Sequence, residues 1–299
     1  MNTYPDSGMR SSTTEPIENR LLAALPEADL QRWRPHVQPV SLPAGTSLTH
    51  AGDSSACVVF PTTASVSLMH TTRDGESLEI LAIGNEGMVG LQAILGGGSA
   101  LAGALVRVGG EGYRVSKAWI QRELHGCSAV MGLMLRYAQT MMAHTTQAAV
   151  CNSHHSLEQR LCRCLLSTFD HGQGAPLHLT HESLSGMLGV RREGVTCAAL
   201  KLQRAGVIHY ARGRMAVVDR TALEARSCEC YRIVKTAYDR MLPGAHPFTT
   251  LASRPPEVLR VAPAAHAAWA TVKHVPHVPH VPHVRHQHRA YVEGNAMNG

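Results

Sequence analysis

The sequence has no long hydrophobic run, no hydrophobic N-terminal stretch and no C-x-x-C pair of cysteines. A membrane-spanning helix needs about 20 consecutive apolar residues, and a secretory signal needs an apolar segment near its start, which MNTYPDSGMRSSTTEPIENR does not provide. We therefore expect a cytoplasmic protein without membrane contact. The eight cysteines are expected to be reduced thiols with no metal site in the core, because the closest pairs, Cys162/Cys164 and Cys228/Cys230, lack the spacing of a zinc or redox clip.

Charge is unevenly distributed along the 299 residues. Acidic residues exceed basic ones by two up to residue 176, whereas basic residues are in excess by five over 177–245 and by three over 246–299. Neutralisation of phosphates dominates affinity for nucleic acids. The segment 177–245 is therefore the expected nucleic-acid-binding part, and the apolar fraction of 44% allows two domains with real cores.

The most informative segment is LTHESLSGMLGVRREGVTCAALKLQRAGVIHY, from Leu179 to Tyr210. An apolar stripe spaced i, i+3, i+4 predicts a helix that Thr180 caps and that Gly189 ends with a left-handed turn. A second stripe predicts another helix directly afterwards. The two stripes are formed by Leu184, Met187 and Leu188, and by Val195, Ala198, Ala199 and Leu202.

Two short helices joined by a tight turn indicate a helix-turn-helix whose second helix enters the major groove of DNA. Arginine can pair with guanine, glutamate can accept from cytosine, and hydroxyl groups such as that of Ser185 can bind phosphate. Oxidation of Cys197, which is expected on the reading face of this helix, is a further hypothesis for weakening DNA binding. The expected DNA contacts from these helices are Thr180, Ser183, Arg191, Arg192, Glu193, Thr196 and Cys197.

The segment VIHYARGRMAVVDR follows and predicts a β-hairpin wing with Arg212 and Arg214 near its tip, where both would contact phosphate. Ordinary helical hairpins can give a similar helix-turn-helix pattern. The coincidence of two stripes, a turn glycine, arginines at the second helix and a basic hairpin favours DNA binding.

The N-terminal half has a different texture. Residues 21–34 predict one or two short helices broken by Pro26, and regularly spaced short strands over 37–115, with a hairpin turn at 73–76, predict a β-sandwich or barrel. From Lys117 to Ala149 a long apolar helix is expected, followed by a helix capped by Ser156. The long helix either pairs with its twin or packs on its own barrel. For the first case the expected dimer contacts are Val130, Leu133, Met134, Tyr137 and Met141.

The order of these parts resembles the Crp/Fnr superfamily of bacterial transcription regulators over roughly 21–243, most specifically from LTHESLSGMLGVRREGV through RGRMAVVDRTALEARSCECY. The resemblance implies an α+β fold with an N-terminal β-roll (a cyclic-nucleotide-binding-like jelly roll), a long dimerisation helix and a C-terminal winged helix-turn-helix. It also implies a homodimer on inverted-repeat double-stranded DNA, with RNA polymerase as a further partner. Arg192 and Glu193 match the family's base-contacting pair, and Cys197 stands where a second base-contacting arginine is often found.

The resemblance divides the chain into five expected parts. These are a disordered N-terminus (1–20), the sensor roll (21–116), the dimerisation helix (117–151), the DNA-binding domain (152–243) and a low-complexity tail rich in histidine and proline (244–299).

The sensor roll departs from the cyclic-nucleotide-binding members, in which a Gly-Glu pair holds the ribose and an Arg-Ser pair holds the phosphate. Here Leu91 follows Gly90, and Ala102-Gly103 replaces the Arg-Ser pair. We predict no tight cyclic AMP binding, because a buried phosphate without such partners is heavily penalised. The members of the family that bind an iron–sulfur cluster need a group of cysteines near the N-terminus. No cysteine precedes Cys57 here, so we do not expect an iron–sulfur cluster. The effector could be another small molecule, a gas bound through haem, or absent. The candidate effector residues are Glu86, Gly87, Gly90 and Arg107, the last as an anion ligand or as a solvated strand arginine.

The tail contains HVPHVPHVPHVRHQH, whose prolines favour an extended conformation. It is either a disordered extension or a metal-binding tract. The alternative function is thus a metal-binding or metal-responsive protein acting through His274, His277, His280 and His283. An enzyme on the roll is not expected, because His50 and His70 are isolated strand histidines without a ligand cluster or a nucleophile and base.

Overall fold

The computed structural model of the chain describes residues 17–96, 99–126, 128–171 and 177–242. The expected histidine-rich tail, with His274 to His283, lies outside these residues, as does the N-terminal segment up to residue 16. The expected boundary of disorder at residue 20 is too late, because Asn19 is fully buried. Its amide donates to the carbonyls of Pro61 (2.8 Å) and Gly87 (3.0 Å), and its side-chain oxygen caps the first helix.

Short helices precede the sheets, as expected from the break at Pro26. Helix α1 (Arg20–Ala23) ends before this proline, which occupies the N-cap of α2 (Glu27–Trp33), and the 3-10 helix η1 (Arg34–His36) follows. Trp33 is fully buried and meets Trp119 edge to face, with ring centroids 4.9 Å apart.

Within the described residues, seven antiparallel strands form the N-terminal roll, which confirms the predicted β-rich half. One sheet has the order β1-β7-β3 and the other β2-β6-β4-β5. The predicted hairpin turn joins β4 to β5, where Gly75 has φ +85°. The strands are β1 (Gln38–Leu42), β2 (Ser47–Thr49), β3 (Cys57–Pro61), β4 (Ser65–Thr71), β5 (Ser77–Ile83), β6 (Gly103–Val108) and β7 (Gly110–Ser116), with α3 (Leu91–Leu95) between β5 and β6.

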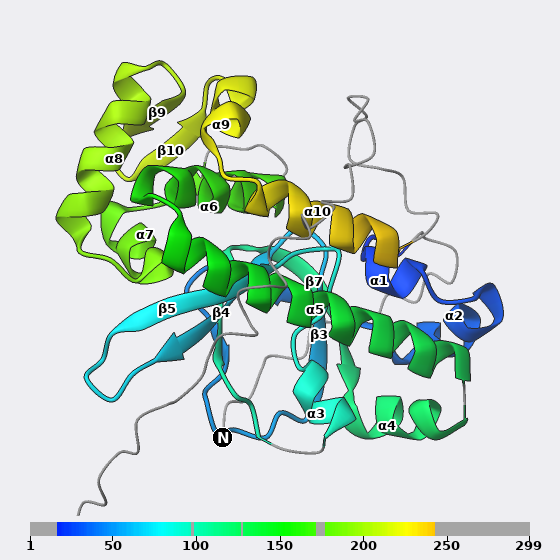
Figure 1. Cartoon of the computed structure of the whole chain (residues 1–299). Coiled ribbons are helices and arrows are strands. Elements are labelled where there is room, and N and C mark those ends of the chain that lie inside the picture. The colour runs from blue at the N-terminus through cyan, green and yellow to red at the C-terminus, as the bar shows by residue number, and fades with distance from the viewer. Residues whose placement is uncertain (1–16, 97–98, 127, 172–176, 243–299) are drawn as a thin grey trace, which may run out of the picture. The chain divides into compact units, whose positions relative to one another are not determined.

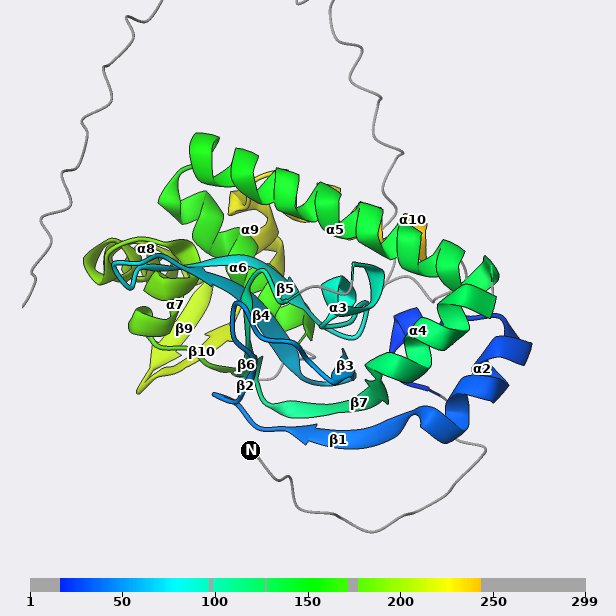
Figure 2. The ribbon, with the colours of Figure 1, turned by 90° about the horizontal axis from the view of Figure 1, so that it is seen from below.

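Two helices occupy the region where one long helix was expected. Helix α4 (Lys117–Gly126) ends at a glycine, and α5 (Ser128–His154) then runs past the sheets (Figures 1 and 2). None of the helices in the described ranges has the length and apolar character that a membrane crossing requires.

The residues expected to form the dimer contact face the chain's own core instead. Val130, Leu133, Met134 and Tyr137 are at most 1% exposed and pack with the N-terminal helices and β3, while Met141 is half-buried against the same cluster. A side chain already covered by its own chain cannot also cover a partner, so this residue set is corrected. The opposite face of α5 exposes Leu135 (55%), Met142 (71%) and Val150 (41%).

The C-terminal part has a core of its own beneath the predicted helix pair. Ser156 caps α6 as predicted, and Leu161, Leu165 and Phe169 of that helix are buried. Its elements are α6 (Leu157–His171), β8 (Leu177–His178), α7 (His181–Leu188), α8 (Arg192–Arg204), β9 (Ile208–Ala211), β10 (Arg214–Val217), α9 (Arg220–Arg226) and α10 (Cys230–Met241).

The last helix leaves the core of the C-terminal part. Helix α10 packs along α5, which Figure 1 shows clearly. Tyr238, Met241 and Leu242 are buried in the same cluster as Leu21 and Trp33. The end of the region expected to form the DNA-binding domain therefore packs with the N-terminal half.

Candidate nucleic-acid interface

The two predicted helices and their turn are present with the predicted end signals. Thr180 is the N-cap of α7, where its hydroxyl accepts from the amide of Ser183 and the Ser183 hydroxyl accepts from the amide of Thr180, at 3.0 Å each. Gly189 ends α7 in the left-handed conformation, with φ +62°. The capping pair satisfies the free backbone amides at the start of α7, and Gly189 adopts the left-handed conformation without steric cost at its end. These features explain why one helix stops and another starts within four residues.

Helix α8 has one buried side and one exposed side at its N-terminal end. The predicted stripe of Val195, Ala198, Ala199 and Leu202 is 0–6% exposed. Arg191 is the N-cap residue, and it is exposed together with Arg192, Glu193 and Cys197. The first turns therefore present two cations, one carboxylate and one thiol beside the positive end of the helix dipole.

Thr196 lies on the same helix but has a different environment. Its hydroxyl is within hydrogen-bond distance of His181 Nδ1 (3.0 Å) and also donates to the carbonyl of Arg192 (3.0 Å). The ring of His181 stacks on Tyr210, with centroids 4.4 Å apart. Thr196 is thus half-buried, and its hydroxyl is already hydrogen-bonded within the chain. His181 and Tyr210, which the sequence interpretation missed, connect α7, α8 and the wing.

The hydroxyls proposed as phosphate ligands are also engaged. Both Thr180 and Ser183 belong to the capping pair, and Ser185 is 7% exposed and donates to the carbonyl of Glu182 (2.8 Å). The burial of Ser185 contradicts its expected role. Thr180 and Ser183 order the start of α7.

The predicted wing is a tight hairpin. Strands β9 and β10 pair in antiparallel register, and the two turn residues, Arg212 (φ +50°) and Gly213 (φ +75°), both have the left-handed conformation of a type I′ turn. Arg212 is exposed at the tip. Arg214 starts β10, where its Nε donates to Nε2 of His178 (3.2 Å) on the neighbouring strand β8.

The four candidate effector residues do not form one site. Gly90 lines a cavity of about 20 Å³ in the roll together with Asp53 and Gln92. Glu86 is buried and bonds elsewhere, and Gly87 lies against Tyr137, whose hydroxyl would be 2.5 Å from an added Cβ. Arg107 alternates with the inward-facing Val106, so its side chain lies on the outer face of the sheet. The expected effector set is therefore corrected, since a ligand inside the roll could reach only Gly90 of these residues.

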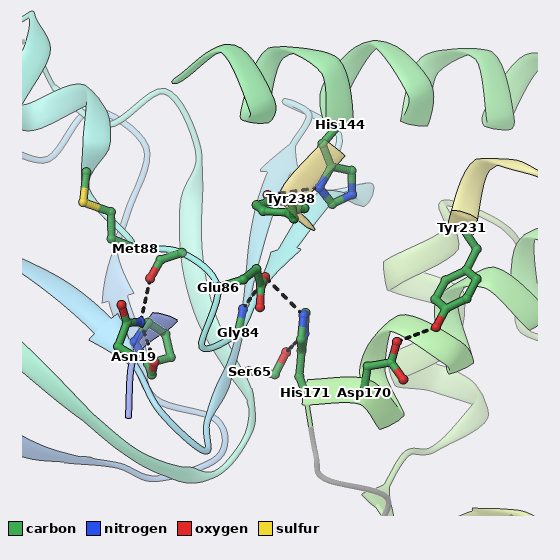
Figure 3. A network of polar contacts seen from close by, with 12 residues as sticks. Asn19, Ser65, Gly84, Glu86, Met88, His144, Asp170, His171, Tyr231 and Tyr238 are labelled. Atoms are coloured by element: carbon green, nitrogen blue, oxygen red, sulfur yellow. Dashed lines mark hydrogen bonds and ion pairs between the residues drawn. The ribbon is translucent and has the colours of Figure 1, made fainter. Parts of the chain in front are cut away.

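Glu86 belongs to a buried polar network between the roll and the C-terminal part (Figure 3). Its Oε1 lies 3.2 Å from Nε2 of His171 and accepts from the amide of Gly84, and the Nδ1 of His171 lies 3.1 Å from the hydroxyl of Ser65. Burial alone would raise the pKa of Glu86, but the charge and hydrogen bond of His171 lower it to about 2. Burial opposes the charged form of His171, whereas Glu86 raises its pKa. The charged pair of Glu86 and His171 thus joins the roll to α6 of the C-terminal part.

A second histidine beside this network has the opposite character. Burial lowers the pKa of His144 to about 3. Its Nδ1 lies 3.4 Å from the hydroxyl of Tyr238 on α10. His144, His171 and Glu86 all line a cavity of about 60 Å³ between α5, α6 and α10.

Comparison with known proteins agrees with this geometry. Residues 159–226 match the family model of the Crp-like helix-turn-helix domain. No curated protein matches the sequence.

Similar solved structures span most of the described chain. A protein of the Crp/Fnr family from Eubacterium rectale is 18% identical with a TM-score of 0.55, and the match covers 69% of this chain and 96% of that one. The c-di-GMP-responsive global regulator CLP of Xanthomonas campestris is 19% identical (TM-score 0.52; 64% and 99% covered). FixK2 of Bradyrhizobium japonicum is 13% identical (TM-score 0.55; 64% and 98% covered).

At these identities the structural likeness establishes the fold, and the family model identifies the domain that contains α7 and α8. The chain therefore carries a Crp-like helix-turn-helix domain over residues 159–226, and its fold is similar to that of the solved Crp/Fnr-type structures.

Proposed function

We propose that this protein is a homodimeric, sequence-specific DNA-binding transcription regulator that reads an inverted repeat with α8. One observation carries the proposal. Helix α8 buries its apolar side against α6 and α7 while its first turns expose Arg191, Arg192, Glu193 and Cys197 behind a well-ordered turn at Gly189. A helix end held rigidly from behind and charged in front is suited to the major groove.

Within this interface the residues have different roles. Arg192 and Glu193 are the proposed base contacts. Arg191, Arg212 and Arg214 are suited to phosphate because they are exposed at the helix start and on the wing. Thr180, Ser183, Thr196 and His181 hold the helices and the wing in position through their hydrogen bonds.

Dimerisation is proposed to use the exposed face of α5. Six of the exposed positions of α5 recur at a spacing of four and three residues, which is the repeat of a coiled-coil seam. Three large apolar side chains on or beside this seam are 41–71% exposed in the single chain, and a second copy would cover them. The seam consists of Leu135, Gln139, Met142, Thr146, Ala149 and Ser153.

A symmetric pair of α8 helices would address two half-sites about 34 Å apart, one turn of the DNA helix. RNA polymerase is the proposed partner at the promoter. For the roll we propose no tight binding of cyclic AMP. The charged residue that lines its 20 Å³ cavity is Asp53, and among the described lining residues there is no cation for a phosphate.

Selection of bound fragments from genomic DNA, at a stated salt concentration and with random duplex as competitor, tests the proposal. We expect enrichment of an inverted repeat. Equal recovery of all sequences, or a protein that stays monomeric at the concentrations used, would contradict it.

Base reading is tested with two arginine variants. Arg192→Ala should cost about 1–3 kcal/mol of binding free energy and relax the preference at one base position, whereas Arg214→Ala should weaken all sequences alike. Affinities for a panel of single-base operator variants separate these outcomes. A loss in Arg192→Ala that is the same for every base at every position would refute direct readout by this residue.

A further inference from the structure

Three cysteines and one histidine meet where two distant parts of the chain come together. Cys151 lies in the last turn of α5, His155 follows that helix, and Cys228 and Cys230 stand at the junction of α9 and α10. The three sulfur atoms and a ring nitrogen of the histidine all lie within 4.8 Å of one another. We refer to these four residues as the hinge cluster, because they join the end of α5 to the junction of α9 and α10.

Two of the six ligand–ligand separations in the hinge cluster match the edges of a tetrahedron around one zinc ion. With Zn–S bonds of about 2.3 Å and a Zn–N bond of about 2.05 Å, tetrahedral geometry places two sulfurs about 3.8 Å apart and sulfur and nitrogen about 3.6 Å apart. The Sγ atoms of Cys151 and Cys228 are 3.6 Å apart, and Nδ1 of His155 is 3.4 Å from Sγ of Cys230. The other four separations are at most 4.8 Å, so the ligand atoms would have to move inward to complete the tetrahedron.

The same residues have the outer partners that metal ligands usually have. His155 directs Nδ1 at the cluster, and its Nε2 lies 3.3 Å from the carboxylate of Glu229. The side-chain amide of Gln147 donates to Sγ of Cys230 at 3.1 Å. A carboxylate behind a ligating histidine fixes the orientation of its ring and increases its basicity.

Burial and the sulfur distances argue against two simpler interpretations. The three cysteines are 0–4% exposed, so they are not surface thiols. The sulfur–sulfur distance of 3.6 Å is far longer than the 2.05 Å of a disulfide, and the seven cysteines of the described ranges are free thiols. Apolar packing accounts for a buried cysteine, but it does not require an imidazole nitrogen and a carboxylate to be aligned with three sulfurs.

We propose that the hinge cluster is a structural Zn²⁺ site with Cys151, His155, Cys228 and Cys230 as its four ligands. Four protein ligands leave no open position for a substrate, which is the arrangement of structural zinc. The ion ties the end of α5 to the start of α10, so it stabilises the connection between the roll and the DNA-binding part. This site is separate from the histidine-rich tail and does not depend on the proposed DNA contacts.

Cobalt substitution in the full chain tests the site without interference from the tail. Thiolate ligands give Co²⁺ an intense near-ultraviolet charge-transfer band, which imidazole nitrogens alone do not. We expect this band at one equivalent in the native chain, with displacement by Zn²⁺. Cys228→Ser should lose most of the band, and the control Cys197→Ser, at an exposed cysteine on α8, should retain it.

Absence of the band in the native chain, or an unchanged band in Cys228→Ser, would overturn the proposal. So would a Cys151–Cys228 disulfide in protein purified under reducing conditions. Glu229→Gln provides a test if Cys228→Ser fails to fold, because Glu229 is 57% exposed and its loss spares the core. Competition with a chelator should show zinc affinity about 10-fold to 100-fold weaker in Glu229→Gln. Equal affinity would contradict the assigned geometry.

Discussion

At the scale of single residues, the wing tip combines a strained backbone with a charge. Arg212 has φ +50°, a conformation that asparagine or glycine adopts at lower cost than arginine. Its exposed guanidinium contributes nothing to the core. Arg212 thus costs stability and places an exposed cation at the tip of the hairpin. Both features fit the proposed phosphate contact.

Replacing this residue should separate stability from DNA affinity. Arg212→Asn should increase the free energy of unfolding by about 0.5–1 kcal/mol, because asparagine tolerates the left-handed turn. The same variant should bind all DNA sequences more weakly. Urea denaturation and DNA titration measure the two effects, and Arg214→Asn, in an ordinary strand conformation, should give no gain in stability.

The pair of Glu86 and His171 makes stability depend on pH. The pKa of His171 is raised, so its contribution is complete below about 6.5 and is lost as the pH rises through its folded value. The pKa of Glu86 is lowered to about 2, so its contribution is present above about 4.5 and is lost as the pH falls toward 2. The pair is therefore fully effective between these limits.

Removing one partner tests this window. Glu86→Gln should reduce the free energy of unfolding by about 3–5 kcal/mol near pH 5.5, because a buried imidazolium would lose its counterion. The difference from the native chain should decrease as the pH rises through the folded pKa of His171. Denaturant midpoints measured across pH provide the test, with Glu182→Gln at an exposed position as the control.

At the scale of elements, the turn between α7 and α8 is a close contact as well as a bend. A Cβ at Gly189 would lie 2.9 Å from Leu78 Cδ1, on strand β5 of the roll. The left-handed φ of +62° adds backbone strain for any other residue. The turn between α7 and α8 and the β4–β5 hairpin of the roll therefore meet at this glycine.

Two glycine substitutions in the same helical motif should have opposite effects. Gly189→Ala should destabilise the protein by about 1–2 kcal/mol through backbone strain and the contact with Leu78. Gly186→Ala lies inside α7, where the added methyl group would have no described atom within 4 Å apart from its chain neighbours and the nearby helix backbone. It should stabilise the protein by about 0.5–1 kcal/mol. Thermal unfolding of both variants is the measurement. A stabilising Gly189→Ala would show that the turn is not held as described.

At the scale of the whole molecule, α5 has two apolar faces, and the chain covers only one. Tyr137 is fully buried, whereas Met142, on the opposite side, is 71% exposed. Covering such a face in a dimer removes apolar area from water, and each Å² of apolar area that is buried stabilises the dimer by about 25 cal/mol.

Met142→Glu should convert dimer to monomer at micromolar concentration without unfolding the chain, because a charge would be buried at the seam. The apolar replacement Met142→Leu should remain dimeric. Sedimentation velocity distinguishes these states. Dimers that persist in Met142→Glu would exclude this face as the interface.

How much of this could be predicted depended on the range of the interactions. Thr180, Gly189 and the stripe at Val195 act within a few residues, and their structural roles as N-cap, helix end and buried face were predicted correctly. In the hinge cluster Cys151 and Cys228 are 77 residues apart in the sequence, and Glu86 and His171 are 85 residues apart. No local spacing therefore indicated either contact. The residues of α5 that face a partner were misassigned, because a helix with apolar side chains on two sides has no period that distinguishes core from interface.

The return of α10 onto α5 determines how the protein can be divided. The family match ends at residue 226, before α10 begins. A fragment that starts at Ser156 and continues to Leu242 would carry Tyr238 and Met241 without the cluster that shelters them, and the remaining N-terminal fragment would have lost the cover on one side of α5. Proteolysis at the loop before α6 should therefore yield two pieces that stay associated until denaturant is added.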